Sequence, residues 1–380
     1  MKIEFHAGFD DMPPAFRDML DAAGALDLFN TRAWFKLLAR HGRYTDEEFG
    51  VYVAWDDDGA PLLVMPVARI HRAGRLLCSR ILASIAHLEN FAPVCIQFRD
   101  GATGRQALMK RFFSRVRWDG ESGPRFDLVR LCPFEINSEY GVMVYRAVRG
   151  AGYWIQAYAN SFNRFEIVEG MSHEDYLAKF TSKERYNIRS RQRGLEKKSD
   201  FDFELIDTEE GLTPVIEEYI KVSMASWKDP TSMINDWIFD LMVLAARHDM
   251  LRLGILRLDG VAVAVQFWLV SAGVAHSVHI AYDEEYKRRH VGVVLTNLMI
   301  GIVLDRDHAK EMSYGFGNEP YKSTWMRDSR FFCGYAGFNS RSFRGNLQGV
   351  LHIIGRPAKK LVLRLLGRAP EEDIDPEISK

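Results

Sequence analysis

The chain has 380 residues, of which 47% are hydrophobic and 27% charged, and its formal net charge is −1 at pH 7. Such a chain folds, and because single cores stop growing near ~250–300 residues we expect two domains. The near-neutral charge excludes a global attraction to nucleic acid, so DNA is not an expected partner. The four cysteines (Cys78, Cys95, Cys132 and Cys333) form no Cys-x-x-Cys pair, which argues against a zinc site or a disulfide framework and fits a reducing compartment.

No targeting or membrane-spanning segment is expected. The N-terminus, Met1-Lys-Ile-Glu-Phe-His6, has no basic region followed by an apolar one. The longest apolar run, Val291–Leu304, has fourteen residues, fewer than the ~18–20 that span a bilayer, and predicts a buried helix. We therefore expect a cytoplasmic protein, at most peripheral at the inner face of the membrane.

Two segments about 200 residues apart repeat one pattern. In the first, a predicted helix at 30–41 precedes apolar runs at 49–55 and 61–70 that flank Asp58-Gly59. In the second, a helix at 235–248 precedes runs at 251–258 and 261–270 that flank Asp259-Gly260. Asp-Gly between apolar runs predicts a β-hairpin, because both central turn positions need positive φ. The repeat favours duplication of one α/β domain; the alternative is chance similarity of two helix–hairpin units.

Gly150-Ala-Gly152 interrupts the pattern and marks the expected domain boundary. We predict a degenerate domain at 1–155, a catalytic domain at 156–336, and a basic helical tail with an acidic end at 337–380. The second half continues with a strand at 273–282, a polar turn, a helix from Val291 and a strand at 311–316. After its hairpin the first half has no basic, glycine-containing turn that opens a helix, so the chemistry is expected in the second copy.

A basic helix is predicted after residue 180. Thr181-Ser-Lys-Glu184 has the form of a capping box, with Thr181 as N-cap. The helix that follows places Arg185, Arg189, Arg193 and Lys197 on one stripe at i, i+4 spacing. One interpretation is a solvated face. The other is a wall that faces a phosphate-bearing or lipid-linked substrate, or tRNA, with Arg185 and Arg189 binding the substrate.

The segment after the strand at 273–282 has the features of an anion site. It reads Tyr286-Lys-Arg-Arg-His-Val-Gly-Val-Val-Leu295 and passes from a strand into an apolar helix. The first N–H groups of a helix have no internal partners, the macrodipole adds positive potential, and Gly292 admits close approach. It is neither a P-loop nor Gly-x-Gly-x-x-Gly. The alternative is a solvated basic turn that caps a core helix.

A family resemblance favours the anion site. Arg289-x-x-Gly292-x-Val294 resembles the acetyl-CoA signature of the GNAT superfamily, Gln/Arg-x-x-Gly-x-Gly/Ala, with Val294 departing at the last small residue. Two further segments, Tyr176–Glu196 and Tyr314–Trp325, resemble the FemAB-like branch, which includes acetyltransferases associated with cellulose and exopolysaccharide operons. The resemblance covers residues 160–335 well and 25–150 weakly. It implies an α/β fold of tandem GNAT-like domains, each a mixed, mostly antiparallel sheet flanked by helices.

The resemblance also implies an acyl-CoA co-substrate, acetyl-CoA or another, and no metal. The implied cofactor-binding residues lie in the basic turn and helix start: Arg288, Arg289, His290, Val291, Gly292 and Val293. A Tyr-Lys pair of the FemAB-like branch matches Tyr321-Lys322. There Tyr321 would act as general acid toward the departing thiolate, and Lys322 would stabilise the oxyanion or bind an acidic substrate.

Three further candidates come from the residues themselves. His276 and His279 lie on opposite faces of one predicted strand, so only one can face a cleft, and we name His279 as a catalytic candidate. Asp283 is a catalytic candidate and Glu319 a substrate-binding one, since both are loop carboxylates near the expected mouth. For each, the alternative is an ordinary core or surface residue.

The tail is strongly basic. Between Ser329 and Pro370 there is no acidic residue and there are eight basic ones. The segment Lys360–Leu366 has the pattern of a basic amphipathic helix, so one interpretation is contact with an anionic membrane through residues 343–368. The alternative is a helix that packs on the catalytic domain. The acidic end at 371–377 would partly offset the attraction.

The predicted function is N-acyl transfer from an acyl-CoA, with acetyl as the expected group, to a small-molecule or lipid-linked amine. An amino sugar or cell-envelope precursor in polysaccharide biosynthesis is the expected acceptor. One alternative is Fem-like aminoacyl transfer from aminoacyl-tRNA, the only case in which tRNA is a partner. Another is a non-catalytic, membrane-associated scaffold with a degenerate site.

Overall fold

The computed structural model describes residues 1–24, 27–42, 47–72, 80–85, 94–117, 126–228, 234–317 and 319–352. The predicted amphipathic segment Lys360–Leu366 and the acidic end lie outside these residues, as does Cys78. The chain divides into two compact units. The first comprises Met1–Ala25, Phe29–Phe162 and the residues from Arg330 onward, and the second comprises Leu26–Leu28 and Asn163–Ser329. No helix within the described ranges is long and apolar enough to cross a membrane.

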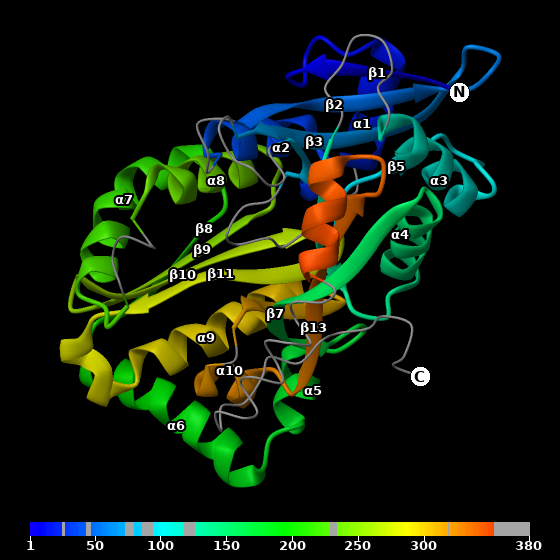
Figure 1. The fold of residues 1–380 in the computed structure, drawn as a ribbon. Helices are drawn as coiled ribbons and strands as arrows, with labels where there is room; N and C mark the ends of the chain where they lie inside the picture. Colours follow the sequence, from blue (N-terminus) through cyan, green and yellow to red (C-terminus); the bar gives the residue numbers. More distant parts are fainter. Residues whose placement is uncertain are drawn as a thin grey trace, which may run out of the picture. The chain divides into compact units, whose positions relative to one another are not determined.

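The first unit is a mixed sheet with helices packed on it (Figure 1). Its strands have the order β1-β2-β3-β4-β6-β13-β7, with β5 paired to β3, and β4–β6 is its parallel pair. Buried side chains such as Phe112, Phe113 and Phe134 form its own apolar core. Its elements are β1 (Lys2–Ala7), α1 (Pro14–Gly24), α2 (Arg32–Arg40), β2 (Glu47–Trp55), β3 (Pro61–His71), β4 (Arg80–Ser84), β5 (Gln97–Phe98), α3 (Arg105–Val116), β6 (Leu128–Glu135), α4 (Glu139–Gly150), the first part of β7 (Tyr153–Ile167), most of β13 (Asp328–Asn339) and a helix over 343–352.

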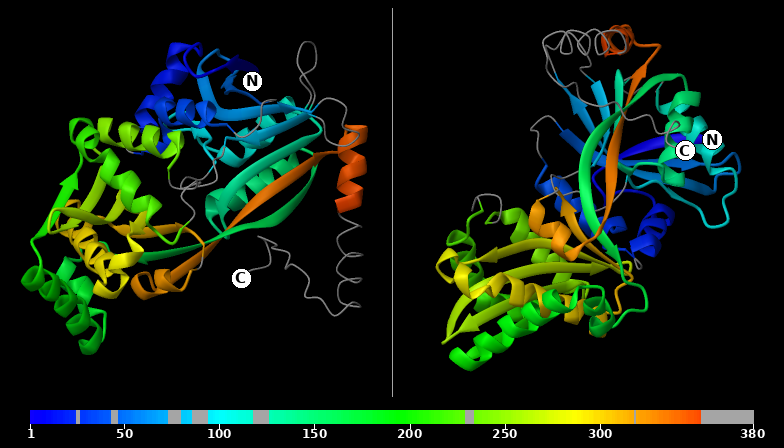
Figure 2. Two further views of the ribbon diagram at one scale, coloured as in Figure 1. Left: turned by 90° about the vertical axis from the view of Figure 1, so that its left-hand side faces the viewer. Right: turned by 90° about the horizontal axis from the view of Figure 1, so that it is seen from below.

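The second unit is built on the same plan, with the strand order β7-β12-β11-β10-β9-β8 and the parallel pair β11–β12. Helices α7 and α8 cover one face of this sheet, and α9, with α6 beyond it, covers the other (Figures 1 and 2). Its further elements are α5 (His173–Ala178), α6 (Ser182–Lys198), β8 (Phe201–Ile206), α7 (Glu209–Met224), α8 (Asp236–Arg247), β9 (Leu251–Leu258), β10 (Val261–Ser271), β11 (Val274–Tyr282), the 3₁₀ helix η3 (Glu284–Arg289), α9 (Val291–Gly301), the π-helical turn η4 (Ile302–Arg306), β12 (Glu311–Phe316) and α10 (Pro320–Trp325).

The predicted repeat is confirmed. Thr31 and Asn235 cap α2 and α8 through their side chains, and each helix leads into a hairpin, β2–β3 or β9–β10. In the second hairpin both turn residues, Asp259 and Gly260, have the positive φ that the motif demands. The predicted fold class is confirmed with it, since each unit is a mixed, mostly antiparallel sheet flanked by helices.

The likeness of the copies extends beyond the hairpins. The order strand, helix, parallel strand, helix is β4-α3-β6-α4 in the first copy and β11-α9-β12-α10 in the second. Helix α3 opens directly after Gly104, whose φ is 63°. The first copy therefore has a glycine turn at the matching helix, but residues 99–104 carry one arginine and one aspartate, so this turn is not basic. The sequence pattern did not show it, because β5 and its flanking residues separate that helix from β4.

The predicted domain ends also differ from the structure. The division falls between Phe162 and Asn163, inside β7, and not at residue 155. The second domain was predicted to reach residue 336, but β13 continues to Asn339 and pairs with β6 of the first unit. The last residues of β7 pair with β12. Each unit is completed by the strand that follows the other copy. A domain boundary predicted from the sequence pattern therefore misplaces both ends of the second domain.

Close packing of α9 on β9 gives the first prediction. A side chain at Gly254 would overlap the Sδ atom of Met299. We expect Gly254→Val to lower the free energy of unfolding by about 1–3 kcal/mol through overpacking. Urea unfolding measures it. Gly194→Ala is the matched control: it lies in α6 with open space around it and should stabilise by about 1 kcal/mol. Equal midpoints for the two variants would contradict the packing argument.

Candidate functional site

The predicted anion site is the start of α9. Strand β11 ends at Tyr282, and Asp283 accepts the N–H of Glu285 at 2.9 Å to begin η3. His290 then takes a left-handed conformation with φ 58° and turns the chain into α9. In the part of the chain that the structure describes, the N–H groups of Val291 and Gly292 donate no hydrogen bond. Two free amides at the positive end of a helix form an anion-binding geometry.

The remaining residues of the signature have other contacts. The N–H groups of Val293 and Val294 both donate to the carbonyl of His290, at 3.0 and 3.2 Å, so they belong to the helix ladder. Val294 is fully buried in the core of the unit, where its larger side chain is accommodated. A Cβ on Gly292 would lie 2.9 Å from the Tyr282 ring. Glycine is therefore needed there because an aromatic ring covers it.

The basic helix and the basic turn converge. The Arg289 guanidinium donates to the hydroxyl of Ser199, the C-cap of α6, and lies over the Tyr286 ring at 5.8 Å. Partial burial and the charge of Arg191 lower the pKa of His290. The C-terminal half of α6 thus adds positive charge beside the start of α9, while Arg288 lies exposed on η3. Two segments about 90 residues apart build one cationic surface.

Beside this helix start, two strands part. Strands β11 and β12 pair only through Val274–His276 and Glu311–Ser313, although β11 continues to Tyr282 and β12 to Phe316. Beyond the paired part, no backbone pairing joins the described residues of β11 and β12, and the carbonyls of Gly315 and Phe316 accept side-chain donors instead, from Asn163 at 2.7 Å and from Lys322 at 2.5 Å. The parted ends lead into η3 and α9 on one side and into α10 on the other.

A buried polar cluster accompanies β11 on the side covered by α7. The Nδ1 atom of His279 lies 2.6 Å from the hydroxyl of Tyr219, which fixes the orientation of the imidazole. Burial, with a smaller contribution from Lys228, lowers the pKa of His279 to about 3. The ring is neutral at physiological pH, and a group with so low a pKa is a weak proton acceptor there. The geometry fits a positioning residue better than the predicted catalytic role.

Tyr321 belongs to the same neighbourhood. The Nζ atom of Lys228 lies 5.9 Å from the centre of the Tyr321 ring, and Tyr314 lies 6.3 Å from it. Burial raises the pKa of Tyr321, and the carboxylate of Glu319 raises it further. The phenol therefore keeps its proton through the neutral range, as a general acid must.

Lys322 and Asp283 have architectural partners. The buried Lys322 ammonium donates to the carbonyl of Phe316 at 2.5 Å and pairs with Glu319 at 2.9 Å, so it ties the end of β12 to α10. Asp283 caps η3. Of the predicted catalytic residues, Tyr321 is thus the one whose described contacts leave its polar group for chemistry, and Glu319 is held by its lysine.

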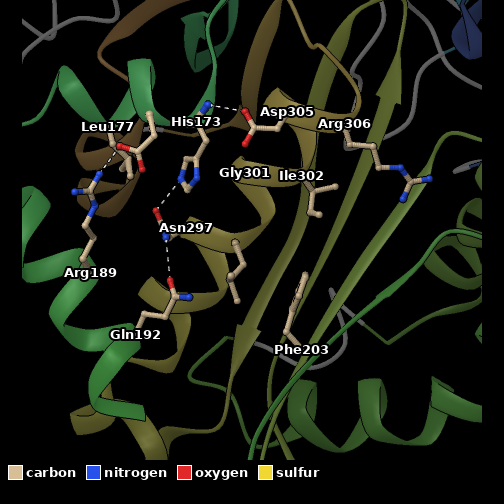
Figure 3. A pocket seen from close by; sticks show the side chains of 12 residues that line it. His173, Leu177, Arg189, Gln192, Phe203, Asn297, Gly301, Ile302, Asp305 and Arg306 are labelled. Atoms are coloured by element: carbon tan, nitrogen blue, oxygen red, sulfur yellow. Dashed lines mark hydrogen bonds and ion pairs between the residues drawn. The ribbon is translucent and has the colours of Figure 1, made fainter. Parts of the chain in front are cut away.

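The two arginines predicted to bind substrate lie elsewhere. Arg185 donates to the carbonyls of Ala178 and Phe180, at 3.0 and 2.9 Å, and so caps the end of α5. Arg189 pairs with Glu174 at the edge of a pocket of about 650 Å³ (Figure 3). The pocket adjoins the second half of α9, one to two turns from the anion site at its start.

Hydrogen bonds order that pocket. The Nε2 atom of His173 lies 3.0 Å from Oδ1 of the buried Asn297, and the amide of Asn297 approaches Gln192 at 3.4 Å (Figure 3). Gly301 leaves room for the imidazole, since a Cβ there would meet His173 at 3.1 Å. Its two arginines each pair with a carboxylate of the protein, Arg189 with Glu174 and Arg306 with Asp207.

Sequence reasoning missed several residues of the candidate site: Arg191, Ser199, Tyr219, Lys228 and Tyr282. Arg191 was visible as a basic residue beside the stripe. The others carry no local signal, because they reach the site from separate elements and act through tertiary contacts.

Comparison with known proteins agrees with this geometry. Residues 182–323 match the model of an acetyltransferase (GNAT) domain. Among solved structures, FemX has a TM-score of 0.56 at 11% identity, with 93% of this chain and all of that chain covered. L-PGS from Bacillus licheniformis has a TM-score of 0.51 at 12% identity, covering 92% of this chain and 99% of that one. A conserved protein of unknown function from Bacteroides thetaiotaomicron has a TM-score of 0.52 at 11% identity, and the match covers 89% of this chain and all of that chain. No curated protein matches the chain in sequence.

At these identities the solved structures show a shared fold. The matched domain, which lies within the second unit, supports GNAT-family acyl transfer as the chemistry of residues 182–323.

The buried imidazole gives a prediction about pH. His279 has a folded-state pKa of about 3 and an ordinary value of about 6.5, so between these values the unfolded chain binds more protons. Stability falls as the pH drops through this window. From pH 7 to pH 5 the loss through this group is about 2 kcal/mol, and His279→Gln should be spared it. Urea unfolding at both pH values measures the difference, with the exposed His248→Gln as control. An unchanged pH slope in His279→Gln would refute the assignment.

Proposed function

We propose that the protein is an N-acyltransferase that moves an acyl group, acetyl in the simplest case, from a CoA thioester to an amine acceptor. The observation that carries the proposal is the start of α9, where two free amides and converging cations lie beside the parting of β11 and β12. The matched GNAT domain spans these elements.

The residues at the helix start fit the diphosphate of CoA. The amides of Val291 and Gly292 would hold phosphate oxygens, with Arg288 and Arg289 supplying charge and Arg191 adding potential from α6. The positive end of α9 would favour the doubly charged group further. The end of β11 that lies beyond its pairing with β12 and leads to Tyr282 would run alongside the extended amide arm.

When bound, acyl-CoA supplies a thioester, an activated acyl group that a neutral amine can attack. Alignment of the two reactants alone contributes about 7–11 kcal/mol to such a reaction. The phenol of Tyr321 is the proposed proton donor to the departing sulfur, since its raised pKa keeps it protonated. Tyr219 and His279 hold their side of the cluster rigid, and Lys322 with Glu319 holds the other.

The acceptor class rests on resemblance. An amino sugar or another amine-bearing precursor of the cell envelope, free or lipid-linked, is the proposed acceptor, as in the FemAB-like exopolysaccharide enzymes that the sequence resembles.

Aminoacyl-tRNA is the second candidate donor, and one feature of α6 favours it. Lys183, Arg193, Lys197 and Lys198 are exposed on this helix and would suit a polyanion. A tRNA donor predicts stabilisation by aminoacyl-tRNA that weakens steeply with salt, and no response to acetyl-CoA.

The donor site has a direct test. Gly292→Asp places a side chain against Tyr282 and a negative charge at the anion site, so it should abolish the rise in melting temperature caused by acetyl-CoA. Gly170→Asp is the matched control, since Gly170 sits in open space at positive φ, a conformation that aspartate tolerates. The control should respond to acetyl-CoA as the wild type does. If acetyl-CoA raises the melting temperature of Gly292→Asp as much as that of the wild type, the donor does not bind at the start of α9.

The proton donor has a kinetic test. Tyr321→Phe should lower kcat about 100-fold and leave KM for acetyl-CoA unchanged, because it removes one proton-transfer group and no volume. Release of free CoA thiol, with glucosamine as the amine probe, gives both constants. Tyr186→Phe, an exposed tyrosine of α6, is the control. An undiminished kcat would exclude Tyr321 as the acid, whereas a raised KM alone would make it a binding residue.

A further inference from the structure

The helix over 343–352 follows β13 in the first unit (Figure 1). Its two glycines lie against the sheet. A Cβ on Gly345 would lie 2.6 Å from the carbonyl oxygen of Asp127, and one on Gly349 would lie 3.1 Å from Cβ of Phe338. One turn further, the His352 ring lies 5.1 Å from the Phe338 ring. The inward face is therefore Gly345, Gly349 and His352, at i, i+4 and i+7.

The opposite face of this helix is apolar. Phe343 is 80% exposed, Val350 40% and Leu351 51%, and Leu347 between them is half-buried. The spacing i, i+4, i+7, i+8 puts all four on one stripe. An amphipathic helix on a protein normally buries its large apolar side chains and exposes its polar ones. Here the glycines face the protein and the large apolar side chains face away, which marks the stripe as a candidate interaction surface.

The described charges at the start of the stripe are positive. Arg341 and Arg344 are exposed at the start of the helix. In sequence, Arg356, Lys359, Lys360, Arg364 and Arg368 follow before the first acidic residue, Glu371. An apolar stripe bordered by cations is complementary to a surface that is apolar inside and anionic at its edge.

We propose that this face docks on an anionic lipid bilayer, with Phe343, Leu347, Val350 and Leu351 inserted at the acyl boundary and with Arg341 and Arg344 on the headgroups. A second copy of the chain fits less well, because pairing the stripes would bring two strongly cationic segments together. RNA would satisfy the arginines but leave the apolar stripe exposed to water. The inference stands apart from the proposed catalytic function, since it concerns the first unit alone.

Vesicle flotation of the full chain tests the proposal. We expect binding to vesicles of phosphatidylcholine and phosphatidylglycerol in equal parts, weakened by high salt, and little binding to phosphatidylcholine alone. Phe343→Ser with Leu351→Ser should lower the partition coefficient at least about tenfold. Arg341→Gln with Arg344→Gln should lower it by about fivefold for each arginine removed, and only on anionic vesicles.

Two controls separate docking from misfolding. Val261→Ser removes an apolar side chain of similar exposure from the second unit and should leave binding unchanged. The Phe343→Ser, Leu351→Ser variant should keep the wild-type melting temperature and its response to acetyl-CoA. Absence of wild-type binding to anionic vesicles overturns the proposal, as does equal binding by that variant. The proposal is also overturned if light scattering shows a dimer that becomes a monomer in this variant. Binding to RNA in place of vesicles overturns it likewise.

Discussion

The parting of β11 from β12 is the constraint on which the second unit depends. Two parallel strands that share hydrogen bonds over only three residues each leave backbone groups that the sheet itself does not satisfy. One strand must then turn into α9 and the other into α10. The helix start with its free amides follows β11, and α10 with Tyr321 follows β12. The close contact of Gly254 with Met299 keeps α9 on the sheet.

The charged and polar groups at the start of α9 come from elements that are distant in sequence. Helix α6 contributes Ser199 and Arg191 to the start of α9, so the positive end of one helix is reinforced by the cationic side of another. The interior side is the reverse: His279 is buried, neutral and bonded to Tyr219. An anion is favoured at one edge of the site and a neutral, ordered environment at the other. That division suits a substrate with a charged handle and an uncharged reactive end.

The two copies differ in what they retain. Both have the strand, helix, parallel strand, helix order, and each sheet is completed by the strand that follows the other copy. Neither copy is therefore a separable stretch of sequence, which accounts for the return of the chain to the first unit from Arg330 onward. The first unit has its own core and ends in a helix whose apolar residues face away from it. In our proposals, the second copy catalyses acyl transfer and the first copy attaches the protein to the lipid bilayer.

The sequence by itself determined the local elements: the Asp-Gly hairpins, the capping box at Thr181 and the strand–turn–helix around Gly292. These depend on backbone preferences and short-range periodicity, which neighbouring residues express. Tertiary structure alone decided that Arg185 caps α5, that Lys322 braces β12, that Tyr219 orients His279 and that β7 and β13 exchange sheets. Arg185 and Lys322 bond carbonyls only five to seven residues away, but several partners lie within that reach and the fold selects among them. Tyr219 meets His279 across 60 residues, and the ends of β7 and β13 pair with strands of the other copy. Residue spacing along the chain does not encode these long-range meetings, because they arise only when the sheet is assembled.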